Sequence, residues 1–460
     1  MHAQRASLND RRRLFLTTLA TGFFGASAAV RIGRGASAIS AWTGTGTNSL
    51  LEQARPQEKG RLAIVKVEPM IMRFQRGQQG ALGGNYCLVC RVETDEGIVG
   101  WGEGTNFPKV APIATEIELN RPALIGQSAW DIEKIWYTLY RGRNAMHGSA
   151  VQSAISAIDI ALWDIVGQKL DVPVYRLLGG KVNDKLKKYL SSPFGRLPRT
   201  PDAYGRRTKE LVAQGAVAGK WDPFVTPADE INLAGTDYNL PRQATLHTIN
   251  ETRALVRAVR EAGPDFEICV EAHAKFNVGS AVRIAKAIEE YNPMFLEEPV
   301  PPENVEAMLE VQRATSIPIA AGERLKSRLE AREYLERDAI RLYQPDAARI
   351  GGITEFRKAI AMAESHFIPV APHNPNGIVC FAAHLHLSAS ASNFTIFEEG
   401  IGGDAAACRE AFGAWQESPA YFWPLETAGI GLRGFTPAFV REHVVDLATA
   451  ERDTTGAVER

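Results

Sequence analysis

The chain has 460 residues, of which 45% are hydrophobic and 23% are charged, and its formal net charge at pH 7 is -1. This is the composition of an ordinary globular protein, and the length is enough for a domain of about 250 residues beside a smaller one. A near-neutral chain without a block of Lys and Arg has no general attraction to phosphate backbones, so nucleic acid is not an expected partner. Five scattered cysteines argue against a disulfide framework and against a structural zinc site.

The N-terminus is expected to be a targeting segment rather than part of the fold. Residues 9–30 combine a basic cluster, an apolar run and small residues, and Arg12-Arg13 with the following Leu-Phe-Leu resembles the twin-arginine signature. We predict an export signal over residues 1–38 and a linker over 39–59, which makes the protein periplasmic, or cytoplasmic if the signal does not function. A basic amphipathic tail or a single anchor is the alternative, and no other segment is expected to cross a membrane. Two cleavage sites fit the sequence, Ala26-Ser27-Ala28 and Ala36-Ser37-Ala38.

Residues 60–150 are predicted to form an α+β domain. Two strand-like segments, 61–74 and 85–103, precede a helical region over 111–141, and the second contains a hairpin turn at Thr94 to Gly97. Cys87 and Cys90 form a C-x-x-C within this second segment. Side chains three residues apart on a strand point to opposite faces, so neither a redox pair nor a chelate is expected.

Residues 151–425 show the alternation typical of a (β/α)₈-type barrel. An apolar helical pattern over 153–170 is followed by short apolar runs separated by longer amphipathic ones. We therefore predict an α/β protein with eight barrel strands; an open doubly wound sheet is the alternative, although a Gly-rich dinucleotide fingerprint is lacking. The eight runs are residues 187–194, 216–224, 266–273, 294–299, 317–324, 340–346, 367–374 and 393–400.

Ionisable residues stand at the ends of six successive runs. Glu271, Glu297 and Glu323 follow one another at intervals of 26 residues, and Asp346, His373 and Glu398 continue the order. The carboxyl ends of parallel barrel strands meet at one mouth, so the three glutamates should converge. Carboxylates in such proximity repel one another unless a cation neutralises them, and oxygen ligands favour Mg²⁺, or Mn²⁺, over zinc.

Several motifs in this part of the chain resemble those of the enolase superfamily, in its mandelate racemase and sugar-acid dehydratase branch. They are GKWDP, VEAHAKFN, FLEEPVPPEN, AAGERL, QPDAARIGGIT and APHNPNG, and the resemblance covers residues 62–440. It implies an enolase-like modified TIM barrel with an N-terminal α+β capping domain, to which residues 426–460 return. Relatives commonly assemble, so a homo-oligomer is expected.

The resemblance also implies roles for individual residues. Glu271, Glu297 and Glu323 would bind Mg²⁺, with Glu298 outside them, and Lys220 would contact the substrate carboxylate. Asp346 and His373 match the family's Asp-His dyad, Glu398 matches the acid of the last strand with Glu399 as the less favoured register, and His273 matches the general acid of the dehydratases. Many relatives have Asp where this chain has Glu271.

The chemistry can also be argued from the residues. A proton beside a carboxylate is a weak acid, and a divalent cation together with Lys220 would stabilise the enediolate that forms when it leaves. His373 is the candidate base, held by Asp346 on the neighbouring strand; Asp346 could instead cap a helix. His273 would protonate the departing hydroxyl, or only hydrogen-bond to substrate or water. Asp222 stands where racemases of the branch have a second lysine, which disfavours two-base racemisation.

The sequence thus indicates a Mg²⁺-dependent dehydratase that converts a small sugar acid, of the galactonate or gluconate kind, to a 2-keto-3-deoxy acid. A cycloisomerase or epimerase is the alternative enzyme, and a binding protein with an inert barrel is the alternative of another class. Arg76, Tyr86 and His147 are possible lid contacts. Residues 224–242 form an insertion after the second barrel strand.

Overall fold

The computed structural model describes residues 60–73, 86–106, 110–142, 148–195, 197–224, 243–400, 404–447 and 449–450. The expected export signal and linker lie outside the described residues. So do Arg76, His147 and all of the insertion except Phe224.

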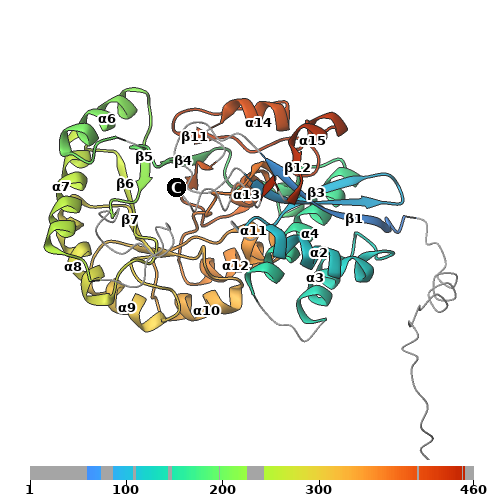
Figure 1. Cartoon of the computed structure of the whole chain (residues 1–460), viewed down its shortest axis with the longest axis horizontal. Coiled ribbons are helices and arrows are strands. Elements are labelled where there is room, and N and C mark those ends of the chain that lie inside the picture. Colours follow the sequence, from blue (N-terminus) through green and yellow to red (C-terminus); the bar gives the residue numbers. More distant parts are fainter. Residues whose placement is uncertain are drawn as a thin grey trace, which may run out of the picture. The chain divides into compact units, whose positions relative to one another are not determined.

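The N-terminal part contains a four-stranded antiparallel sheet in the order β12-β1-β2-β3, with β1 Ile64–Arg73, β2 Tyr86–Thr94, β3 Val99–Glu103 and β12 Val444–Val445. Helices α2 (Val110–Leu124) and α3 (Ile132–Arg141) accompany it (Figure 1). In the β2–β3 turn, Gly97 N donates to Thr94 O at 2.9 Å. All five cysteines of the chain are buried and none forms a disulfide, and Cys87 and Cys90 belong to different core clusters, as expected for opposite faces of β2.

Helix α4 (Ser149–Lys169) lies between this sheet and the barrel. A Cβ added at Gly102 would stand 1.8 Å from Ala157 O, so β3 packs on α4 only because glycine occupies that position. Within the described residues, α4 is long and apolar enough to cross a membrane, but 83% of the relevant window is buried inside the protein. It is therefore a core helix.

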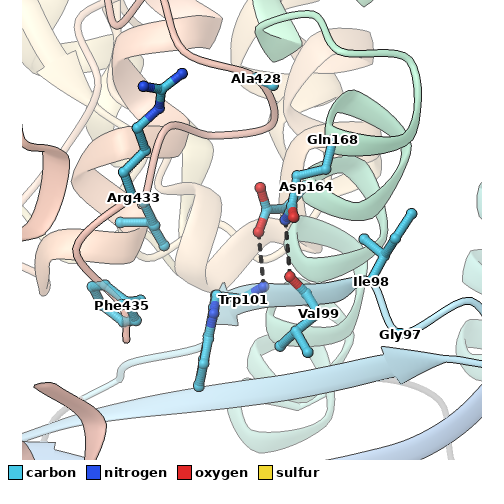
Figure 2. A pocket seen from close by; sticks show the side chains of 10 residues that line it. Gly97, Ile98, Val99, Trp101, Asp164, Gln168, Ala428, Arg433 and Phe435 are labelled. Carbon is cyan, nitrogen blue, oxygen red and sulfur yellow. Dashed lines mark hydrogen bonds between the residues drawn. The ribbon is translucent and has the colours of Figure 1, made fainter. Parts of the chain in front are cut away.

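Asp164 of α4 ties three segments together, as Figure 2 shows in part. Its Oδ2 accepts from Trp101 N at 3.0 Å and its Oδ1 from Ile430 N at 2.9 Å, while Gln168 Nε2 donates to Val99 O at 2.9 Å. Burial raises the pKa of Asp164 to about 6. A cleft of about 590 Å³ opens beside it, lined by Trp101, Arg433 and Phe435 among others.

The second part is a closed parallel barrel, which excludes an open sheet. The strands run in the order β10-β4-β5-β6-β7-β8-β9, and single bridges from Val370 to Tyr343 and Phe394 fill the remaining place. Eight buried residues, one from each strand position, form a cluster of their own: Tyr189, Ala218, Cys269, Phe295, Ala320, Leu342, Ala371 and Ile396. The predicted fold class is confirmed, with strands shorter than the apolar runs. Their bounds are β4 Leu186–Ser191, β5 Ala218–Trp221, β6 Glu267–Glu271, β7 Phe295–Glu297, β8 Ile319–Ala321, β9 Leu342–Tyr343 and β10 Phe397–Glu398.

Helices follow the barrel strands along the chain (Figure 1). Six of the described helices begin with a Thr, Asn or Ser whose side chain accepts a hydrogen bond from a backbone N–H of the first turn: α6, α7, α8, α9, α10 and α15. The helices are α5 Val174–Leu177, α6 Pro201–Ala213, α7 Leu246–Ala262, α8 Val278–Ile288, α9 Val305–Ala314, α10 Arg328–Glu336, α11 Ala347–Ile350, α12 Gly352–Ser365, α13 Ile378–Ser390, α14 Ala405–Phe412 and α15 Pro437–His443, with the 3₁₀ turn η2 Glu289–Tyr291 and the short strand β11 Tyr421–Phe422.

Candidate active site

Three glutamates from consecutive strands meet at the barrel mouth. Glu271 and Glu297 end β6 and β7, Glu323 follows β8, and the three offer ligand oxygens that all lie within 4.8 Å of one another. Their exposed fractions are 3%, 1% and 6%. Burial and the Glu271 carboxylate raise the pKa of Glu297 to about 8, because a second negative charge beside Glu271 is unfavourable. The donor set of three buried carboxylates fits a hard divalent cation such as Mg²⁺.

Lys220, at the end of β5, lies among these carboxylates. Its Nζ is 3.2 Å from Glu271 Oε2, 2.9 Å from Glu297 Oε2 and 3.3 Å from Glu398 Oε1. Burial alone would lower the pKa of Lys220, but the carboxylates of Glu297 and Glu398 raise it well above its ordinary value. The ammonium group of Lys220 is therefore kept charged. It lies where the family resemblance implies a contact with the substrate carboxylate.

Two further groups hold the glutamates in place. Arg324 forms ion pairs with both Glu298 and Glu323. Gln344 Nε2 donates to Glu297 Oε2 at 2.7 Å. Glu298, fully buried with φ 38°, therefore supports the cluster through Arg324.

His373 and Asp346 form a buried dyad beside the cluster. His373 Nδ1 lies 2.8 Å from Asp346 Oδ2, and His373 Nε2 lies 2.7 Å from Glu323 Oε2. Burial alone would lower the pKa of His373, but the carboxylates of Glu323 and Asp346 raise it to about 10. Asp346 also caps α11, since its Oδ1 accepts from Ala348 N at 2.8 Å, so the dyad and the cap expected as alternatives coexist.

His273 reaches the same mouth from the loop after β6. Its backbone N donates to Glu271 Oε1 at 2.7 Å, and its Nδ1 lies 2.6 Å from Asp222 Oδ2. Lys275, which is 4% exposed, forms an ion pair with the same Asp222 oxygen. Asp222 is therefore occupied by two partners rather than facing the site as a base.

The register at the end of the last strand is resolved by two ion pairs. Glu398 faces the site, where its Oε1 contacts Lys220 and its Oε2 accepts from Asn374 N at 2.6 Å. Glu399 lies 3.0 Å from Lys188 Nζ instead. Of the two, Glu398 is the one that belongs to the site.

The N-terminal sheet contributes a carboxylate to the loop that carries His373. Glu103, at the end of β3, is fully buried and accepts from Gly377 N at 2.7 Å, Cys380 N at 2.8 Å and Thr105 Oγ1 at 2.6 Å. Burial raises its pKa. These bonds fix the start of α13 against the capping domain.

A second group of potential ligands, Asp346, Cys380 and His384, does not fit a metal ion. Ala347 N donates to His384 Nε2 at 2.9 Å, and His384 Nδ1 lies 2.9 Å from Asn374 Oδ1, so both ring nitrogens are occupied in the neutral form. Burial lowers the pKa of His384 to about 4 and raises that of the Cys380 thiol well above its usual range. This group is a structural hydrogen-bonding network.

The structure brings all eight predicted site residues to one mouth: Lys220, Glu271, His273, Glu297, Glu323, Asp346, His373 and Glu398. Sequence reasoning missed most of their partners. Arg324, next to Glu323, and Gln344, two residues before Asp346, were readable from the same motifs. Asn376, whose Nδ2 donates to Asp346 Oδ1 at 2.8 Å, lies in the quoted APHNPNG.

A barrel with this mouth, capped by a sheet that supplies Glu103, defines a member of the enolase superfamily. The chain matches "Mandelate racemase / muconate lactonizing enzyme, N-terminal domain" over residues 62–179 and "Enolase C-terminal domain-like" over residues 203–433, and it belongs to that family of enzymes.

Named relatives place it more closely. The chain is 36% identical to a D-gluconate dehydratase of Thermoproteus tenax over 74% of its length and 67% of the relative's, and 36% identical to a D-galactonate dehydratase of Ralstonia nicotianae over 68% and 78%. A solved structure of a mandelate racemase/muconate lactonizing enzyme-like protein from a Roseovarius species superposes with a TM-score of 0.73 at 30% identity, covering 83% of this chain and 95% of that one. The expected family is confirmed.

Proposed function

We propose that this enzyme is a hydro-lyase that removes water from a sugar acid of the aldonate kind and yields a 2-keto-3-deoxy acid. The observation that carries the proposal is a pair of histidines, His373 and His273, each bound to an aspartate and both adjoining the three-glutamate cluster. Elimination of a β-hydroxyl needs one group to take a proton and another to give one. The names of the relatives support a sugar acid as substrate.

Glu271, Glu297 and Glu323 would hold Mg²⁺, which would supply positive charge opposite the substrate carboxylate as its α-carbon loses a proton. Lys220 places a second positive charge at the same carboxylate. His373, in the neutral form that a cation on Glu323 would favour, takes the C2 proton, and the electron pair left on C2 forms the C2–C3 double bond as the C3–O bond breaks. His273 gives a proton to the leaving oxygen, so water departs and the enol tautomerises to the keto acid.

The two halves of this reaction can be measured apart. The chain without residues 1–38 is incubated with Mg²⁺ in deuterated water with aldonic, aldaric and uronic acids, and both keto-acid formation and deuterium at C2 are followed. We expect keto acid from at least one aldonate, loss of both signals in His373→Asn, and loss of keto acid with retained C2 exchange in His273→Asn. The two variants control for each other, because each removes one imidazole from the same mouth.

Other outcomes favour other functions. Exchange at C2 with an inverted C2 product and without keto acid would identify an epimerase, which the second Asp-His pair makes the next candidate. Binding without exchange would identify an inert barrel and refute the proposal.

A further inference from the structure

We infer that Asp222 and Lys275 are positioning residues for His273, so that the mouth contains a second cation–aspartate–histidine unit built like the first. The inference rests on the proposed function, because it assigns these residues to the proton-donating half of the elimination. Both residues lie within the motifs GKWDP and VEAHAKFN. From the sequence, Asp222 was interpreted only as a replacement for the second lysine of racemases.

The two units share three contacts, and Asp346 additionally accepts from Asn376 Nδ2. Asp346 Oδ2 lies 2.8 Å from His373 Nδ1 and 3.1 Å from Arg349 Nε, and its Oδ1 accepts from Ala348 N at 2.8 Å. Asp222 Oδ2 lies 2.6 Å from His273 Nδ1 and pairs with Lys275 Nζ, and its Oδ1 accepts from Phe224 N at 2.8 Å. In each unit one carboxylate oxygen is fixed by the amide two residues ahead, and the other binds both the imidazole and a cation.

This geometry constrains the ring of His273. With Nδ1 bound to Asp222, the proton that His273 can deliver to a substrate is the one on Nε2. The carboxylate also fixes the orientation of the ring, as in other Asp-His pairs. The ion pair with Lys275 in turn holds the Asp222 side chain, which is 17% exposed, in the orientation that contacts His273 rather than solvent.

The backbone around His273 supports a functional rather than incidental arrangement. His273 and Ala274 have φ of 47° and 58°, a left-handed conformation that costs free energy in residues with a Cβ. The bond from His273 N to Glu271 Oε1 and the bond from Ala274 N to Glu298 O, at 2.7 Å each, hold this turn in place. The turn carries the imidazole back to the cluster instead of letting it continue along the strand.

The competing explanation is structural: Asp222 could serve only to neutralise buried Lys275 and to close the turn to Phe224. In the variant Asp222→Asn an amide oxygen still accepts from Phe224 N, while the negative charge beside both His273 and Lys275 is lost, so activity and stability measured together separate the two explanations. Asp346→Asn is the matched control, since it makes the same change in the first unit. Lys275→Met is a second variant that keeps the bulk of the side chain.

The test uses three readouts on the enzyme with Mg²⁺: keto acid from the preferred aldonate, deuterium exchange at C2, and fluoride release from its 3-deoxy-3-fluoro analogue. Fluoride is a better leaving group than hydroxide, so its departure depends less on a proton donor. In Asp222→Asn we expect keto-acid formation to fall about 100-fold while exchange and fluoride release stay within about threefold of wild type. Lys275→Met should show the same pattern with a smaller loss, and Asp346→Asn should lose all three signals.

If exchange and fluoride release fall in Asp222→Asn together with keto-acid formation while its melting temperature is unchanged, or if keto-acid formation does not fall, the positioning role is wrong. If Asp222→Asn does not fold, the same reading is made on Lys275→Met. If wild-type protein exchanges the C2 proton of none of the sugar acids tested, the proposed function itself is refuted, and this inference with it.

Discussion

Removing the ammonium group of Lys220 tests whether the carboxylate cluster is built for a cation. The side chain is 8% exposed, and Nζ lies 2.9 Å from Glu297 Oε2 and 3.2 Å from Glu271 Oε2. Breaking a buried ion pair leaves charge without a partner and costs about 3–5 kcal/mol. We expect Lys220→Met to lower the free energy of unfolding by that amount when EDTA is present.

Saturating Mg²⁺ should remove much of this loss, because the ion would neutralise the same Glu271 and Glu297 carboxylates. If it restores about 2 kcal/mol, linkage requires the variant to bind Mg²⁺ about 30-fold more tightly than wild type does. The variant would thus bind Mg²⁺ more tightly but lack the Lys220 ammonium group proposed to contact the substrate carboxylate.

Urea unfolding with and without Mg²⁺, together with calorimetric titration of Mg²⁺, measures both quantities. Lys188→Met is the matched control: Lys188 is 3% exposed and pairs with Glu399 at 3.0 Å, away from the cluster. It should lose stability equally with and without Mg²⁺ and bind the ion as wild type does. Unchanged or weaker Mg²⁺ binding by Lys220→Met would refute a shared site.

Three further predictions concern other parts of the chain. The pKa of buried His384 is about 4, below its unfolded value, so its contribution to stability is complete above about pH 6.5 and is lost as the pH falls toward 4; at about pH 5 urea unfolding should show a loss of about 2 kcal/mol that His384→Gln lacks. Asp164→Ala leaves the Trp101 and Ile430 amides without their acceptor and should cost about 2–5 kcal/mol in urea unfolding without changing the specific activity of the folded fraction. Residues 1–38 fused to a folded fluorescent protein should direct it to the periplasm, and replacing both Arg12 and Arg13 with Lys should keep it in the cytoplasm.

Each of these has a contrary outcome. Equal acid sensitivity in His384→Gln and wild type would show that His384 already titrates normally. An Asp164→Ala variant as stable as wild type would mean that water replaces the carboxylate, and export that survives the double lysine change would exclude the twin-arginine interpretation.

The sequence was most informative where the spacing of residues along the chain determines their position in the barrel. Glu271, Glu297 and Glu323 could be placed at one mouth because parallel strands end at the same edge and one βα unit separates the three. Period-two alternation cannot choose between adjacent residues at the end of a short strand, so Glu398 and Glu399 stayed ambiguous until Lys188 and Lys220 were located.

Contacts between loops were beyond the sequence. Asp222 and Lys275 are separated by 53 positions and meet only because β5 and β6 are neighbours and the turn at His273 folds back. Histidine is several-fold enriched at positive φ but still rarely adopts it, and Ala274 beside it has no such preference, so the sequence did not indicate this turn. Similarly, the run 367–374 reads as a strand, but within the described residues its β-bridges are confined to Val370, since prolines at 369 and 372 remove two backbone donors.

The pairing of β12 with β1 has a consequence for biosynthesis. Ile71 and Met72, near the start of the chain, find their neighbours Val445 and Val444 only after the whole barrel has been translated. Until then one edge of the cap sheet is open to intermolecular pairing, and a contact of such sequence separation forms slowly. A ribosome-bound chain therefore carries an incomplete capping sheet throughout elongation. The N-terminal strand β1, rather than the segments made last, would need chaperone protection for the longest time.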